Sequence, residues 1–121
     1  MNAVLDTTVL IDYLNGIPEA ATEIDQYDRI TISVISWIEV MAGVKTDEED
    51  AIARKFLETF TIHPVDVDVA DLAAKLRTSE RLRVPDAIIR ATARVLGQLL
   101  VTRNSKDFPA SEPGIRIPYS L

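Results

Sequence analysis

The side chains of this sequence that could do chemistry are carboxylates placed next to predicted strands and helices. Asp6 directly follows a short apolar run, and Glu39 lies in the helix after the second predicted strand. Asp86 begins a later helix, and Asp107 comes shortly after the last long apolar run. Because the carboxyl ends of parallel strands meet at one edge of a sheet, we expect these four side chains to converge there.

Several carboxylates in one cleft repel one another, which favours a bound cation. Oxygen ligands suit hard ions such as Mg²⁺ or Mn²⁺, held by a few carboxylates together with water. Such a site can lower the pKa of a bound water and stabilise an in-line displacement at phosphorus. The chain has no cysteine, and its single histidine, His63, has no second ligand or nucleophile near it in the sequence. The sequence therefore predicts metal-assisted phosphodiester hydrolysis.

Two of the acids also have a structural explanation. Ser36 and Glu39 have the spacing of a capping box, in which both side chains stabilise the first turn of a helix. Asp86 stands at a helix start, where a negative charge complements the helix dipole. The sequence alone leaves these roles open beside the catalytic ones.

Predicted strands and helices alternate along the chain, and they must position the acids. The expected strands cover residues 3–5, 30–36, 61–67, 98–102 and 115–117. The expected helices run from Thr7 or Thr8 to Leu14, from Pro18 to about Tyr27, from Ser36 to Gly43, from Thr46 to Phe60, from Asp66 or Asp68 to Leu76, and from Pro85 to Gly97. This alternation predicts one three-layer α/β/α domain over residues 1–121, with a mostly parallel sheet of roughly five strands. Pro64 places the strand 61–67 at a sheet edge.

The composition limits the classes of function. Apolar residues make up 47% of the 121 residues, which is ample for one core. The net charge of −6 argues against a protein whose whole surface grips nucleic acid by charge, but it allows a local basic rim. The absence of cysteine excludes disulfides and thiolate metal sites. No apolar run approaches the length of a membrane span, so we expect a cytoplasmic protein without membrane contact.

Four segments make the sequence similar to a known family. They are VLDTTVLIDYL at 4–14, SVISWIEVMAG at 33–43, VPDAIIRATA at 84–93 and LLVTRNSKDF at 99–108. In this order and spacing they resemble the PIN domain, and within it the VapC-type toxin ribonucleases of toxin–antitoxin pairs. The resemblance covers essentially the whole chain and implies a PIN-like α/β/α fold with endoribonuclease activity.

The resemblance also implies roles for the acids. Residues that match Asp6, Glu39 and Asp86 bind divalent metal, Mg²⁺ or Mn²⁺, in this family. Many relatives carry an aspartate where this chain has Asn104, so Asn104 and Asp107 compete for the fourth position of the site. Thr102 is expected to support the site, with its hydroxyl directed to Asp6 or to a phosphate. Its alternative role is that of a strand-favouring threonine.

The same resemblance implies macromolecular partners. RNA is the implied substrate, and a VapB-like antitoxin is the implied inhibitor, with a homodimer or a larger toxin–antitoxin assembly. Candidate contacts to the RNA backbone are Arg83, Arg90, Arg103 and Lys106. Arg90 lies one helical turn after Asp86, so pairing with that acid is its other expected role.

Two other classes of function remain as alternatives. A receiver-type phosphoacceptor domain has a similar length and acidity, but it needs an adjacent acidic pair after the first strand, and Asp6 stands between Leu5 and Thr7. A catalytically weak PIN-fold binding module would explain Asn104. The three retained acids argue against such a module.

Overall fold

The computed structural model describes residues 1–121 and contains one five-stranded sheet. The strands are β1 (Asn2–Leu5), β2 (Arg29–Ser33), β3 (Thr61–His63), β4 (Leu99–Val101) and β5 (Ile115–Arg116). Their order in the sheet is β3-β2-β1-β4-β5, and every pair is parallel. The predicted parallel sheet of five strands is thus confirmed, with β1 at its centre and β3 at an edge.

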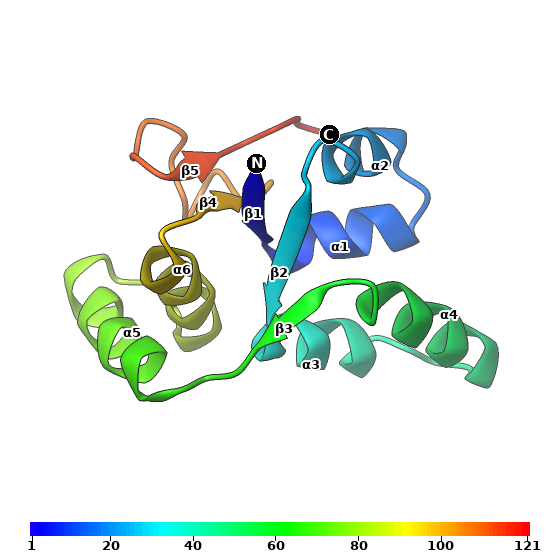
Figure 1. Cartoon of the computed structure of the whole chain (residues 1–121), viewed down its shortest axis with the longest axis horizontal. Coiled ribbons are helices and arrows are strands. Elements are labelled where there is room, and N and C mark those ends of the chain that lie inside the picture. Colours follow the sequence, from blue (N-terminus) through cyan, green and yellow to red (C-terminus); the bar gives the residue numbers. More distant parts are fainter.

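Six helices cover the two faces of the sheet. They are α1 (Thr7–Leu14), α2 (Pro18–Ile24), α3 (Val34–Ala42), α4 (Asp47–Leu57), α5 (Val67–Ser79) and α6 (Val84–Leu96). Figure 1 shows α5 and α6 on one side of the strands and α1, α2 and α4 on the other. The predicted three-layer α/β/α architecture is confirmed.

The central strand is buried on both faces because its successive side chains point to opposite sides. Ala3 and Leu5 pack with side chains of α1 to α4, whereas Val4 packs with side chains of α5 and α6. All three are fully buried. Two cores of similar size therefore hold β1 in place, and with it the residue that follows Leu5.

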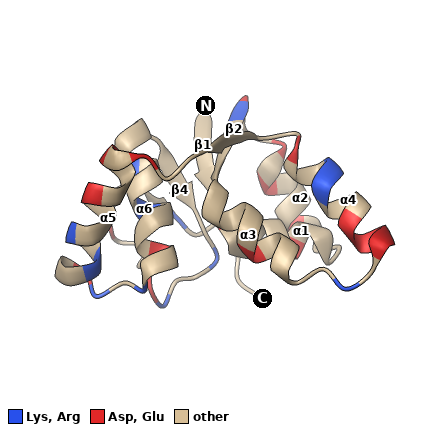
Figure 2. Ribbon diagram, turned by 90° about the horizontal axis from the view of Figure 1, so that it is seen from below, with Lys and Arg blue, Asp and Glu red and all other residues tan.

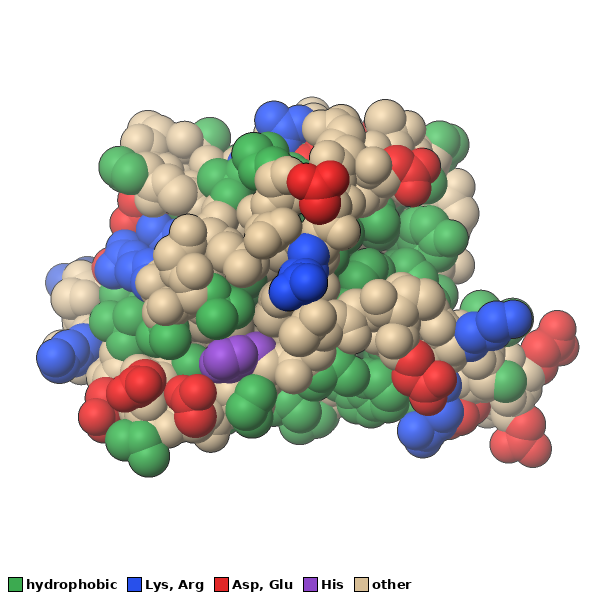
Figure 3. Space-filling view, in the orientation of Figure 1, with side chains coloured by type: hydrophobic (Ala, Val, Ile, Leu, Met, Phe, Trp, Pro, Cys, Tyr) green, Lys and Arg blue, Asp and Glu red, His purple; other side chains and the backbone are tan.

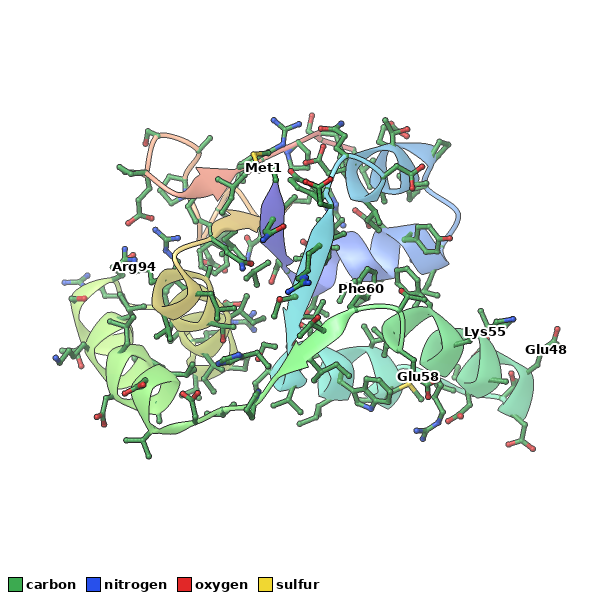
Figure 4. The ribbon with its side chains drawn as sticks, in the orientation of Figure 1. Met1, Glu48, Lys55, Glu58, Phe60 and Arg94 are labelled. Atoms are coloured by element: carbon green, nitrogen blue, oxygen red, sulfur yellow. The ribbon has the colours of Figure 1, made fainter.

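Aromatic side chains fasten α4 against α1 on the outer side of the molecule. The rings of Tyr13 and Phe56 stack with their centroids 4.3 Å apart, and Phe60 meets Phe56 edge-on at 5.0 Å. Phe60 lies between α1 and β3, while Glu48 and Lys55 on α4 point away from the molecule (Figure 4). This arrangement follows from the amphipathic spacing of the α4 sequence.

The boundary between β2 and α3 differs from the prediction. The strand ends at Ser33, and the Ser33 side chain caps α3 by accepting a hydrogen bond from the Ile35 amide at 3.1 Å. Ser36 is buried inside the helix and caps nothing, so the capping box of Ser36 and Glu39 is wrong. The β-branched run favours a longer strand, and the earlier cap overrides that preference.

Most other predicted element ends lie within three residues of the observed ones, but β3 ends at His63, four residues before the predicted end at 67, because Asp66 already caps the next helix. Asp66 caps α5 by accepting a hydrogen bond from the Val69 amide at 2.9 Å, and Gly97 ends α6 with a positive φ of 64°. The second helix ends at Ile24, three residues before the predicted end at Tyr27. No helix combines the length and the apolar composition needed to cross a bilayer.

Candidate active site

Asp6 is held at the carboxyl end of β1 by hydroxyl groups from two parts of the chain. It is 3% exposed and serves as the N-cap of α1, a role that we predicted for Thr7 or Thr8. Its Oδ2 atom accepts hydrogen bonds from Thr8 Oγ1 at 2.7 Å and from Thr102 Oγ1 at 2.8 Å. The predicted contact of Thr102 is confirmed. None of these bonds uses Oδ1, so one carboxylate oxygen is left for a ligand.

Glu39 is fixed by the residue that follows Asp6. The Thr7 hydroxyl lies 2.7 Å from Glu39 Oε1 and 2.9 Å from Ser36 Oγ, so it bridges α1 and α3. Glu39 is itself exposed, unlike Asp6. The hydrogen bond orients the glutamate while its second oxygen, Oε2, keeps access to solvent water.

Asp86 lies in the first turn of α6 and is 7% exposed. Burial raises the pKa of its carboxyl, and the negative charges of Asp6 and Asp107 raise it further. Arg83 opposes this effect, because its Nε and Nη2 atoms lie 3.4 and 3.3 Å from Asp86 Oδ2. Each of α3 and α6 contains a single acid, and Figure 2 shows one red segment on each of these neighbouring helices. Asp6 and Asp107 thus lie near enough to Asp86 at this edge of the sheet to act on its carboxyl.

The competitors for the fourth position bind each other. Asn104 Nδ2 donates to Asp107 Oδ2 at 3.0 Å, and the Asp107 amide donates to Asn104 Oδ1 at 3.3 Å. The backbone amide of Asn104 also donates to Thr102 Oγ1 at 3.0 Å. This hydrogen bond connects the loop to the threonine that donates to Asp6. Asn104 and Asp107 therefore form one unit, with Asp107 as the only charge.

The donor set fits a hard divalent cation. All candidate ligands are carboxylate or amide oxygens, which Mg²⁺ and Mn²⁺ prefer. No group of three or more acidic or histidine side chains stands in position to hold a metal ion, so the four predicted ligands do not form one closed cage. Mg²⁺ is usually held by only one or two carboxylates and keeps several waters. Asp6 and Asp86 are the two buried acids of this set, called the buried pair below, whereas Glu39 and Asp107 are exposed.

The predicted basic contacts divide into buried and exposed groups. Arg90 is 2% exposed, and its Nη2 donates to the Pro113 carbonyl at 3.0 Å, so its assignment as an RNA contact or a partner of Asp86 is wrong. Its long side chain fills space between α6 and the loop before β5 instead. Lys106 is exposed, as is Arg83 beside Asp86. The face in Figure 3 carries separate basic side chains rather than a continuous basic surface.

The structure adds supporting residues that the sequence reasoning missed. Thr7 and Thr8 both serve acids of the site, and their position directly after Asp6 was a usable signal. The pairing of Arg83 with Asp86 was signalled by their separation of three residues across a helix start. Asp12 and Arg103 form a bidentate ion pair that no local pattern announced, because 91 positions separate them.

Comparison with known protein sequences identifies the family of the chain. The family model of the PIN domain matches residues 3–110. Ribonuclease VapC19 of Mycobacterium tuberculosis is 32% identical over 124 residues, which cover 95% of this chain and 98% of the relative. Ribonuclease VapC10 of the same organism is 30% identical over 125 residues, which cover 97% and 92%.

Solved structures share the fold over nearly the whole length. A toxin-antitoxin complex from Klebsiella pneumoniae contains a chain with a TM-score of 0.92 and 40% identity, covering 98% of this chain and 99% of that one. The DNA-bound VapBC from Salmonella typhimurium has a chain with a TM-score of 0.82 and 23% identity, which shows the shared fold. The chain therefore belongs to the PIN domain family and is a relative of the VapC ribonucleases.

Proposed function

We propose that this chain is a divalent-metal-dependent endoribonuclease and the toxin of a VapBC-type toxin–antitoxin pair. The observation that carries the proposal is the buried pair of Asp6 and Asp86, each with one oxygen engaged in hydrogen bonds and the other left without one. Relatives at 30–32% identity along almost the full chain bear the name ribonuclease. Together these support hydrolysis of RNA phosphodiester bonds.

The side chains divide the work of hydrolysis. Asp6 and Asp86 would hold Mg²⁺ or Mn²⁺, with Asp107 and Asn104 as supporting residues. The chemistry that a bound divalent cation would supply is polarisation of the attacking water and compensation of the negative charge that develops at the phosphate. Glu39, oriented by Thr7, accepts a proton from that water. Arg83 and Lys106, both exposed, contact the RNA backbone beside the site.

The proposed inhibitor is a VapB-like antitoxin. Its support is the toxin-antitoxin complex from Klebsiella pneumoniae, which contains a chain 40% identical to this one. Several other solved structures with this fold are VapBC or FitAB assemblies. A homodimer of this chain within such an assembly is part of the same proposal.

Cleavage of RNA by the purified full chain tests the proposed activity. We expect a single-stranded RNA to be cut in the presence of Mg²⁺ or Mn²⁺ and to stay intact in EDTA. Asp6→Asn and Asp86→Asn should each lower the cleavage rate by at least about 100-fold, because each removes one charged ligand. Circular dichroism checks that both variants remain folded.

Asp71→Asn is the matched control, because it removes an exposed aspartate of α5 by the same change. It should cleave like the parent. Equal cleavage by the parent, Asp6→Asn and Asp86→Asn, all folded, contradicts the proposal. Incubation with a small phosphodonor tests the receiver alternative, which predicts an acyl phosphate that a nuclease does not form.

A further inference from the structure

A buried carboxylate in α1, the helix that Asp6 caps, has no part in the proposed hydrolysis. Asp12 is 3% exposed and lies six residues after Asp6. Both of its oxygens are taken by Arg103, with Nε to Oδ2 at 2.6 Å and Nη2 to Oδ1 at 2.9 Å. The Tyr119 hydroxyl donates to Oδ2 at 2.8 Å. Burying a charge costs free energy unless it is paired in this way, so these three residues form one unit.

This unit connects three separate parts of the chain. Asp12 belongs to α1, Arg103 follows β4, and Tyr119 lies in the tail after β5, which returns to the side of α1 and α2 (Figure 1). The two guanidinium nitrogens of Arg103 match the two oxygens of the Asp12 carboxylate, so the pair fixes the direction of the Arg103 side chain. The turn after β4 is therefore clamped against α1.

The turn after β4 also contains groups that hydrogen-bond to Asp6 or to its neighbour Thr8. The Arg103 amide donates to Thr8 Oγ1 at 3.1 Å, and Thr8 Oγ1 donates in turn to Asp6 Oδ2 at 2.7 Å. Thr102, one residue earlier, donates to the same Oδ2 at 2.8 Å. The Thr102 hydroxyl and the Arg103 backbone amide therefore connect the turn after β4 to Asp6 and Thr8 at the start of α1.

We propose that Asp12, Arg103 and Tyr119 form a positioning triad that sets the orientation of the Asp6 carboxylate. This inference rests on the proposed metal-dependent ribonuclease function. It assigns Arg103 to positioning and not to contact with RNA. The Asp12 pKa fits this assignment: burial raises it, but the hydrogen bonds from Arg103 and Tyr119 and the charge of Arg103 lower it overall.

The chain provides a control in a second set that likewise joins a buried acid, an arginine and a tyrosine. Glu23 is 3% exposed. Arg116 donates to both of its oxygens, with Nε to Oε2 at 2.6 Å and Nη2 to Oε1 at 2.9 Å. The Tyr27 hydroxyl donates to Oε2 at 2.5 Å. This control triad ties β5 to α2, and none of its side chains hydrogen-bonds to a residue of the proposed site.

The test compares Arg103→Lys with Arg116→Lys. Lysine keeps the positive charge but loses the bidentate fork, so a contact to RNA by charge survives and a positioning role does not. We expect Arg103→Lys to weaken Mn²⁺ binding to the RNA-free protein by about tenfold, as for other residues that orient metal ligands. Its kcat should fall by about tenfold with an unchanged KM. Arg116→Lys should leave the Mn²⁺ dissociation constant, measured by calorimetry, and kcat unchanged.

Tyr119→Phe and Tyr27→Phe form a second pair of variants, each of which removes one hydroxyl. They test the positioning role of the triad if Arg103→Lys does not fold. We expect Tyr119→Phe to shift Mn²⁺ affinity and kcat in the same direction, by about threefold, and Tyr27→Phe to shift neither.

Three results overturn the triad. Equal effects of Arg103→Lys and Arg116→Lys, or of the two tyrosine variants, indicate structural roles only. A higher KM for Arg103→Lys, with unchanged kcat and Mn²⁺ affinity, assigns Arg103 to the RNA. A parent that neither binds Mn²⁺ nor cleaves RNA overturns the proposed function and the triad's role with it. If the parent both binds Mn²⁺ and cleaves RNA, either of the first two results overturns the triad alone and leaves the proposed function standing.

Discussion

At the scale of single residues, threonine hydroxyls hold two acids of the proposed site by hydrogen bonds. Thr8 and Thr102 donate to Asp6, and Thr7 donates to Glu39. A hydroxyl donor satisfies one carboxylate oxygen without neutralising the group, so the charge stays available to a cation. Asp86 differs, because its engaged oxygen faces the guanidinium of Arg83. The buried pair thus contains one acid held by neutral donors and one held by a cation.

Replacing Asp86 separates its cost to folding from its use in catalysis. Its raised pKa means that the folded state disfavours the ionised carboxyl, first because of burial and then because of nearby negative charge. At pH 7, Asp86→Asn should therefore raise the free energy of unfolding of the metal-free protein by about 0.5–2 kcal/mol while abolishing cleavage. Urea denaturation in EDTA measures the stability. A loss of stability in Asp86→Asn would show that the Arg83 pair outweighs the repulsion.

Sequence reasoning reached the site residues unevenly. The contact of Thr102 with Asp6 was expected from the resemblance to the PIN domain, and it forms because the two residues follow adjacent parallel strands. The buried position of Arg90 was not, because helical spacing alone does not say which face of α6 is covered on the side of the loop before β5. The capping box at Glu39 failed because Ser33 ended the strand earlier than its β-branched sequence suggested.

Charged triads tie the C-terminal strand and tail to the first two helices at the scale of elements. Arg116 of β5 binds Glu23 of α2, and Tyr119 of the tail binds Asp12 of α1. The segment from β5 onward contributes few core side chains, so these polar contacts hold much of it in place. Breaking one partner of a buried charged pair leaves the other without compensation, which is costly.

Acid should weaken the connection between α2 and β5. The Glu23 pKa lies below its ordinary value of 4.5, because hydrogen bonding to Arg116 outweighs the effect of burial. A lowered folded-state pKa gives stability that is present above pH 4.5 and lost as the pH falls through the lowered value. Glu23→Gln should lower the free energy of unfolding by about 1.5–3 kcal/mol at pH 7, because charged hydrogen bonds are lost.

This deficit should shrink as the pH falls below 4.5. Urea denaturation across the pH range 2–7 measures it. Glu19→Gln, an exposed acid on the same helix, serves as the control and should follow the parent at every pH. A deficit of Glu23→Gln that stays constant down to the lowest pH would contradict the role of the ionised glutamate.

The type and order of the elements could be predicted from sequence better than their ends. Apolar runs without alternation predicted the buried parallel strands, and glycine and proline predicted several helix ends. Residue-level detail depended on contacts between distant segments, such as those of Arg116 with Glu23, across 93 positions. Local patterns carry no information about such pairs.

The parallel sheet explains, at the scale of the whole molecule, how acids from four parts of the chain come to one edge. Asp6 follows β1, Glu39 lies on the helix after β2, Asp86 begins the helix that leads into β4, and Asp107 follows β4. Because β1 lies between β2 and β4, the first acid stands at the centre of this arrangement. Cores on both faces keep the edge rigid, which suits a site that must hold a cation at fixed positions.

The location of Mn²⁺ in a crystal of the full chain tests the central claim most directly. We predict an anomalous difference peak within about 2.5 Å of both Asp6 and Asp86 carboxylates, the range of metal–oxygen bonds. The peak should vanish in Asp86→Asn crystals soaked in the same way. A peak at another place, or no peak in a parent protein that still cleaves RNA only with Mn²⁺, would contradict the account of the site.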